Sequence, residues 1–204
     1  MIDGRTFVSL PQVRSATARD EELSDLYFAY GSNMNLQQIR SRCSRPTVVA
    51  VARLADHRMS FYGHSEIWDG AVETVEPAPG EEVRGVLFRL SSLDWERLDL
   101  WQDARLDGGG QYFHLPVTVT DLVGKAHRVR LYKKDVQGAP RVPSQEYLEY
   151  IARGATENGL PSSYVEALLQ QNAHKASYSV PMRPGSDLGK AAGISCAECP
   201  SGAA

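Results

Sequence analysis

The sequence predicts an α+β fold, in which a small mixed β-sheet curls towards a barrel and helices flank it. Three observations support this class. A chain of 204 residues fits one domain. The segments rich in β-branched and aromatic residues are short and end at Gly, Pro or Asp. The predicted helices do not alternate regularly with these strands, which disfavours a doubly wound parallel sheet.

Seven strands are expected, and all lie in the central part of the chain. They cover residues 26–30, 48–54, 58–62, 71–75, 83–90, 112–120 and 126–132. The last two are separated by Asp-Leu-Val-Gly-Lys, a connection of hairpin length.

Four helices are expected between and after the strands. A short one follows Asn33 and stops before Pro46, because the residue before a proline disfavours helical angles. The second begins at Ser91, which forms a capping pattern with Asp94. We expect its apolar residues Leu93, Leu98 and Trp101 to share one face. The last two cover residues 145–153, started by Ser144, and 161–172, with a proline in the first turn.

The composition divides the chain into three parts. Residues 1–24 read as a poorly ordered lead-in, residues 25–175 as the folded domain, and residues 176–204 as a tail or extended arm rich in small residues. Cys196 and Cys199 form a C-x-x-C pair in this tail. One such pair supplies only half of a structural zinc site, so we expect an exposed tail rather than a metal or redox centre.

Charge and cysteine content exclude several functions. The net charge is −3 and the basic residues are scattered, which argues against binding to nucleic acid or to an anionic membrane. The sequence has no apolar run of roughly 20 residues and no recognisable signal peptide. Three cysteines and the absence of a leader favour a cytoplasmic location. The five histidines show no metal-ligand spacing, and we read them as structural or exposed: His57, His64, His114, His127 and His174.

The segment Tyr-Phe-Ala-Tyr-Gly-Ser-Asn-Met, residues 27–34, joins a buried strand to a helix. Gly31 lets a ligand approach the main chain closely, and Ser32 and Asn33 favour turns and helix starts. The amides that follow would then point outwards and bind a carboxylate or stabilise an oxyanion. The alternative is a plain turn in which Asn33 is the N-cap of the helix.

Four segments together resemble the γ-glutamylcyclotransferase-like (AIG2-like) family. They are YFAYGSNM, VARLADHRMSFYG, PGEEVRGVLFRL and GATENGLPSSYVEAL, and the resemblance covers about residues 25–170. It implies a small barrel with a cavity in which the loop Tyr30, Gly31, Ser32 and Asn33 binds a γ-glutamyl group through backbone amides. Tyr112 matches a tyrosine that lines this cavity in the family.

The family reaction implied by this resemblance needs no metal and no cofactor. The α-amine of a small γ-glutamyl compound attacks its own side-chain amide, which closes a 5-oxoproline ring and expels an amine. A glutamate of the enzyme carries the protons in a Leu-Asp-x-x-Glu-Gly context. Here the corresponding segment reads Leu98-Asp99-Leu100-Trp101-Gln102-Asp103, so Gln102 occupies the glutamate position.

An amide cannot carry protons at neutral pH, and three interpretations of Gln102 remain open. Asp103 can act as the shuttle after a shift of one residue, and it is our first choice. Another carboxylate, such as Glu66 or Glu73, can have taken the role, although a glutamate in an alternating strand more often faces solvent. The third is a changed function: an amide hydrolase or acyltransferase, or a non-catalytic protein that binds an amino-acid-like ligand.

Other nucleophiles and the oligomeric state complete the sequence-based expectations. Ser32 has no His and Asp partners in its sequence context, which disfavours a serine-hydrolase triad. Cys43 lies at the end of a helix without a paired histidine, and we expect it to be incidental. The sequence leaves the oligomeric state open, including a homodimer.

Overall fold

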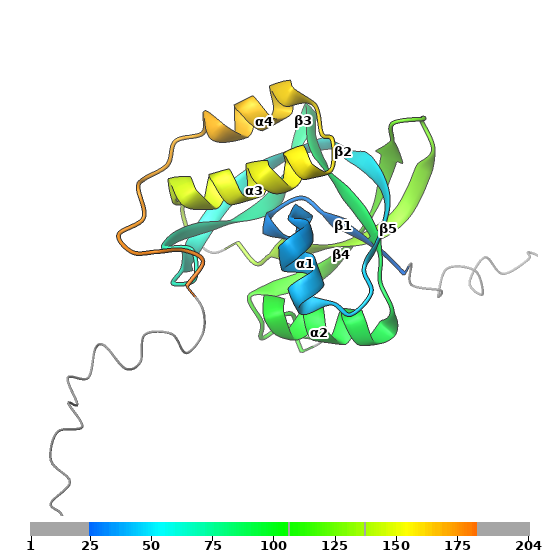
Figure 1. The fold of residues 1–204 in the computed structure, drawn as a ribbon, viewed down its shortest axis with the longest axis horizontal. Coiled ribbons are helices and arrows are strands. Elements are labelled where there is room, and N and C mark those ends of the chain that lie inside the picture. Colours follow the sequence, from blue (N-terminus) through cyan, green and yellow to red (C-terminus); the bar gives the residue numbers. More distant parts are fainter. Residues whose placement is uncertain (1–24, 106, 137, 183–204) are drawn as a thin grey trace, which may run out of the picture.

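The protein folds as a five-stranded closed barrel with helices packed around it (Figure 1), which confirms the predicted α+β class. The computed structural model describes residues 25–105, 107–136 and 138–182. The strand order is β1 (Leu26–Ala29), β3 (Gly70–Arg89), β2 (Thr47–Ser65), β4 (Tyr112–Asp121) and β5 (Ala126–Lys134). Neighbours pair antiparallel except β1 and β5, which pair parallel and close the barrel.

The two longest strands correct the sequence prediction. The expected strands 48–54 and 58–62 are one strand, β2, and 71–75 and 83–90 are likewise one strand, β3. The turn residues between them form a bulge instead of a break: Asp56 has φ of 54°, and its Oδ1 accepts a hydrogen bond from the Gly80 amide at 2.9 Å. A bulge bends a strand without ending it, so the turn-type residues here do not mark strand ends.

The helices fall at the expected places, with different ends. A 3-10 turn, η2 (Ser32–Met34), precedes α1 (Leu36–Arg42), and α2 covers Ser92–Gln102. Helix α3 (Gln145–Glu157) is longer than predicted, whereas α4 (Ser162–Leu169) is shorter. Figure 1 shows α3 and α4 together along one side of the barrel, and α1 close to α2.

The predicted apolar face of α2 is wrong. Leu98 is fully buried, but Leu93 and Trp101 are 52% and 47% exposed. Leu93 and Leu98 are five residues apart, which places them about 140° apart around a helix. The buried face of α2 instead carries Asp94, Trp95 and Leu98.

The strand before the loop divides the core in two. Tyr27 and Ala29 pack in a cluster with residues of α1, α2 and α3, whereas Phe28 and Tyr30 pack in a second cluster formed by barrel strands. This split follows from the alternation of side chains along a strand. It also places the Tyr30 side chain in the cluster of barrel strands, away from the helices.

The first residues of the predicted tail lie on the folded domain. The Met182 amide donates to the Ile67 carbonyl at 2.8 Å, and the Ser177 amide donates to Asp69 at 2.6 Å. Both acceptors belong to the turn between β2 and β3. Residues 1–24 and 183–204, with Cys196 and Cys199, lie outside the described residues. Within the described ranges, no helix has the length and apolar character needed to cross a bilayer.

Helix α3 approaches the end of the 3-10 turn so closely that only glycine fits at the contact. A Cβ added at Gly154 would lie 2.4 Å from the Asn35 nitrogen and 2.7 Å from the Met34 carbonyl carbon. Gly154→Ala should therefore destabilise the protein by about 1–3 kcal/mol, through overpacking. This is opposite in sign to the usual effect, because alanine normally favours a helix over glycine by about 0.5–1 kcal/mol.

Urea unfolding of Gly154→Ala checks this expectation, with Arg153→Ala as the control because Arg153 is exposed on the same helix. A Gly154→Ala protein as stable as the wild type would show that α3 does not hold the turn in this way.

Candidate active site

The loop after β1 forms a 3-10 turn whose amides differ in their partners. The amides of Met34 and Asn35 donate to the carbonyls of Gly31 and Ser32, at 3.0 and 3.1 Å. These donors are therefore used within the turn, and they do not point outwards as predicted. The Ser32 amide instead donates to the side-chain carboxylate of Glu73.

The alternative interpretation, with Asn33 as the helix N-cap, is also wrong. Asn35 caps α1, and its Oδ1 accepts from the Gln38 amide at 3.0 Å. Asn33 is buried, and its side chain connects two groups: Nδ2 donates to the Tyr27 hydroxyl at 2.9 Å, and Oδ1 accepts from Arg42 Nη1 at 2.6 Å.

Glu73 on β3 is the carboxylate that faces this loop. It is 7% exposed, contrary to the expectation of a solvated strand residue. The Tyr147 hydroxyl of α3 donates to its Oε2. A Cβ at Gly31 would lie 1.7 Å from its Oε1, so a glycine at this position makes room for the carboxylate.

Burial raises the pKa of the Glu73 carboxyl above its ordinary value. The hydrogen bond from Tyr147, the charge of Arg42 and the Ser32 amide favour the ionised form and oppose this shift in pKa. Burial has the larger effect, so Glu73 holds its proton to a higher pH than an exposed glutamate does.

A cavity of about 120 Å³ opens in front of Glu73 and the Ser32 end of the loop. Its walls come from the 3-10 turn η2, the strands β2, β3 and β4, the helices α1, α2 and α3, and connecting segments. The lining residues are Ser32, Arg42, Ser65, Ile67, Trp68, Val72, Glu73, Trp101, Gln102, Asp103, Gln111, Tyr112 and Tyr147.

Arg42 supplies a positive charge to the same cavity. Its guanidinium is held by Asn33 and lies 5.0 Å from the centre of the Trp101 ring. The cavity therefore presents a guanidinium, a buried carboxyl group and a backbone N–H. An adjoining hollow of about 520 Å³ shares Arg42, Ile67 and Trp101 with it, and residues 179–182 form part of its wall.

Only two of the predicted substrate-binding residues, Ser32 and Tyr112, line the cavity. The Tyr112 hydroxyl is 3.5 Å from the Glu73 carbonyl oxygen. The Tyr30 side chain points into the barrel core, where its hydroxyl donates to the Tyr132 carbonyl at 2.6 Å. Gly31 provides space for Glu73, and Asn33 orients Arg42.

Gln102 and Asp103 both reach the cavity wall at the end of α2. Asp103 has φ of 46°, in the left-handed region, and ends the helix. Its carboxylate accepts from Arg105 Nε at 2.8 Å and from the Gln111 amide at 3.3 Å. The role of Asp103 as proton shuttle stays a prediction.

The remaining candidates lie away from the cavity. Glu66 is exposed. Cys43 is buried at the end of α1, and burial raises the pKa of its thiol to about 12, so it remains protonated at neutral pH. Among the residues that the structure describes, no group of three or more His, Cys, Asp or Glu side chains is arranged to hold a metal ion.

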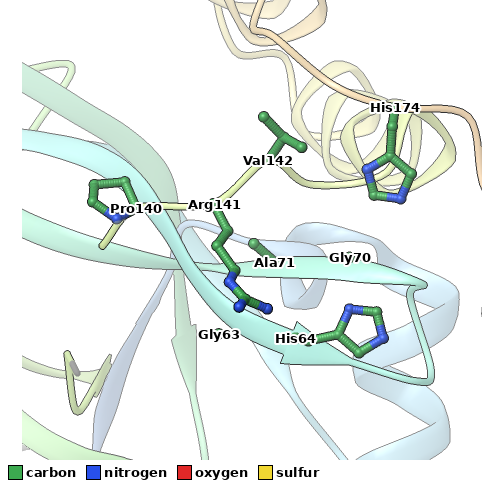
Figure 2. A pocket seen from close by; sticks show the side chains of 8 residues that line it. All are labelled: Gly63, His64, Gly70, Ala71, Pro140, Arg141, Val142 and His174. Atoms are coloured by element: carbon green, nitrogen blue, oxygen red, sulfur yellow. The ribbon is translucent and has the colours of Figure 1, made fainter. Parts of the chain in front are cut away.

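A second hollow, of about 520 Å³, is shown in Figure 2. The side chains of His64, Arg141 and His174 lie around it, and His174 Nε2 is 2.7 Å from the Asp69 carbonyl oxygen. None of its described lining residues belongs to the loop 30–33. We therefore place the candidate active site in the smaller cavity, where the loop and two charged groups meet.

Comparison with known proteins identifies the family. Human γ-glutamylcyclotransferase is 36% identical over 160 residues, which cover 76% of this chain and 82% of the human protein. The chain belongs to the γ-glutamylcyclotransferase family. The bovine γ-glutamylcyclotransferase is 34% identical over 163 residues, and a family model described as AIG2-like matches residues 82–168.

Solved structures of this family agree with the barrel. A structure of a γ-glutamyl cyclotransferase superposes with a TM-score of 0.70 at 33% identity, covering 76% of this chain and 92% of that one. A human structure described as uncharacterized protein loc79017 gives the same TM-score at 32% identity, with the same coverage. The γ-glutamylcyclotransferase fold therefore accounts for the domain that carries the cavity.

Sequence reasoning missed two residues of the site and underestimated a third. Arg42 and Tyr147 lie in helices whose sequence gives no sign of a ligand site. Glu73 did give a signal, because it is the one acidic residue in the otherwise uncharged stretch Ala71 to Val75. The first six residues of β3, 70–75, are buried, and a buried acid needs hydrogen-bond partners, which here are Ser32 and Tyr147.

The raised pKa of Glu73 predicts a pH-dependent difference in stability between the wild type and Glu73→Gln. The unfolded chain releases this proton near the ordinary value of 4.5, whereas the folded protein keeps it to higher pH. The favourable contribution of the protonated group is therefore complete below pH 4.5 and is lost as pH rises through the folded pKa. Each unit of elevation in the pKa corresponds to about 1.4 kcal/mol.

Urea unfolding of both proteins between pH 4 and pH 8 measures this difference. We expect Glu73→Gln to gain stability relative to the wild type as pH rises. A constant difference, or one of opposite sign, would show that the folded pKa of Glu73 is not raised.

Proposed function

We propose that this protein cleaves γ-glutamyl amides by intramolecular attack of the α-amine and releases 5-oxoproline and a free amine. The proposal is supported by the membership of the γ-glutamylcyclotransferase family and by one observation within the cavity. A guanidinium, a buried carboxyl group and the backbone N–H of Ser32 that donates to it converge where the loop meets β3. This set of groups complements an amino-acid headgroup with an adjacent amide carbonyl.

Each part of the substrate has a counterpart in the cavity. Arg42 pairs with the α-carboxylate of the γ-glutamyl group. A planar guanidinium can donate two parallel hydrogen bonds to a carboxylate, which makes this a strong and specific pair. The Ser32 amide donates to the γ-carbonyl oxygen. Tyr112 forms part of the cavity wall, and the leaving amine extends into the adjoining hollow beside Ile67 and Trp101.

The reaction needs little more than correct placement. The nucleophile is part of the substrate, and holding it in attack geometry can lower the barrier by roughly 7–11 kcal/mol. The developing oxyanion is stabilised by the Ser32 amide, a backbone donor that the substrate takes over from the Glu73 carboxylate. The α-ammonium must first lose a proton, and the leaving nitrogen must gain one, so a proton carrier is also required.

We also propose a cytoplasmic location, on the basis of the low cysteine content of the chain.

The direct test is product analysis of the purified full-length protein. Incubation with γ-glutamylalanine, γ-glutamylcysteine, glutathione and a γ-glutamyl alkylamide should yield 5-oxoproline from at least one of them, detected by mass spectrometry. Release of glutamate instead would indicate a hydrolase. The appearance of neither product would refute the proposed activity.

Ser32→Pro tests the role of the backbone donor, because proline has no N–H and tolerates the first position of a helical turn. We expect kcat/KM to fall about 10²- to 10³-fold, the usual effect of losing one oxyanion donor. Ser32→Ala is the matched control. It removes the hydroxyl that accepts from Gln38 Nε2 at 2.6 Å but keeps the amide, so it should retain most activity.

Equal losses in Ser32→Pro and Ser32→Ala, with both proteins folded by circular dichroism, would assign the effect to the hydroxyl and remove the amide from the mechanism.

A further inference from the structure

We propose that Glu73 is the proton carrier of the reaction, and that it replaces the glutamate whose family position is occupied here by Gln102. The inference rests on the proposed function. Glu73 comes from β3 rather than from the end of α2, so the carboxylate enters the same cavity from a different wall.

Position is the first argument. The Glu73 carboxylate accepts from the Ser32 amide, the donor that we assign to the γ-carbonyl oxygen of the substrate. When the substrate takes this donor, the carboxylate is released beside the carbonyl group. Both the attacking and the leaving nitrogen bond to the carbonyl carbon, so one carboxylate at this place reaches both.

The proton transfers then balance through one group. The neutral α-amine attacks the γ-carbonyl carbon, a C–N bond forms, and the negative charge moves to the oxygen held by Ser32. The Glu73 carboxylate accepts a proton from the attacking nitrogen. The resulting carboxylic acid donates this proton to the leaving nitrogen as the original amide bond breaks, which restores the Glu73 carboxylate and releases 5-oxoproline and the amine.

The surroundings of Glu73 suit a group that must both accept and donate a proton. Burial raises its pKa above the ordinary value, and general acid–base catalysis at neutral pH favours a carboxyl group whose pKa is raised. Tyr147 holds Oε2, and the absence of a side chain at Gly31 gives Oε1 space beside the loop. Tyr147 is thus a positioning residue, because it acts through the carboxylate.

Asp103 is the competing carboxylate, and its contacts differ. It accepts hydrogen bonds from Arg105 and from the Gln111 amide, and its side chain is 38% exposed. These partners fix the turn that follows α2. Glu73 is buried and bonded to the loop that we assign to the substrate.

Kinetics of Glu73→Gln, Asp103→Asn and Glu76→Gln compare the candidates with a matched control. Glu76 is on the same strand, and its carboxylate accepts from Ser60 and Tyr62 instead of the loop. The assay follows 5-oxoproline release from the substrate that the wild type converts fastest among the four tested above. Circular dichroism and thermal unfolding confirm that each variant folds.

We expect Glu73→Gln to lower kcat about 10²- to 10⁴-fold, which is the usual contribution of general acid–base catalysis. Glu76→Gln should stay within threefold of the wild type, and Asp103→Asn should lose far less than Glu73→Gln. The wild-type kcat should fall at acidic pH with a midpoint above 4.5, and this limb should be missing from the residual activity of Glu73→Gln.

Two results would overturn the inference while leaving the proposed function intact. The first is a wild type that forms 5-oxoproline and a Glu73→Gln variant whose kcat is within tenfold of the wild-type value. The second is a larger loss of kcat in Asp103→Asn than in Glu73→Gln. An increase in activity in Glu73→Gln would also overturn it, because the carboxylate would then be an obstacle to substrate. If the wild type forms no 5-oxoproline from any of the four compounds, the proposed function fails first.

Discussion

The contact between the Glu73 carboxylate and the Ser32 amide is the interaction on which the rest of the site depends. A buried carboxylate is costly unless it is hydrogen-bonded, and here a backbone donor and the Tyr147 hydroxyl supply the bonds. The contact also explains why residue 31 is glycine, since any side chain there would occupy the place of Oε1. It thereby ties the loop, β3 and α3 into one unit.

The barrel brings these three segments together from distant parts of the sequence. β1 pairs with residues 86–89 at the end of β3, whereas the loop that follows β1 contacts Glu73 near the start of the same strand. Helix α3 then closes over the turn, with Gly154 against the backbone at Asn35 and Tyr147 directed at the carboxylate. Asn33 of the same loop is buried, and its side chain holds Arg42 in the cavity wall.

The fold class, the position of the loop and the family could be predicted from the sequence, because they depend on local patterns: strand composition, a Gly-Ser-Asn turn and capping residues. The partners of the loop amides and the N-cap of α1 could not. Prediction from the sequence failed where tertiary context decides. Asp56 and Gly80 have the residue types of strand ends, but they lie at an irregularity in the β2–β3 pairing, and both strands continue beyond it. Glu73 looked solvated because period-two alternation does not reveal that α3 covers that face. Arg42 and Tyr147 carry no local signal at all.

The titration of the Glu73 carboxyl group is the most direct test of its proposed role as proton carrier. Carbon-13 NMR of protein labelled at the glutamate carboxyl carbon, with Glu73 assigned by its absence in Glu73→Gln, gives the midpoint in the free protein and in the presence of 5-oxoproline. The account predicts a midpoint above the ordinary 4.5 and a clear change of the Glu73 signal when 5-oxoproline binds. A midpoint at or below 4.5, with a signal that does not respond to 5-oxoproline, would contradict it.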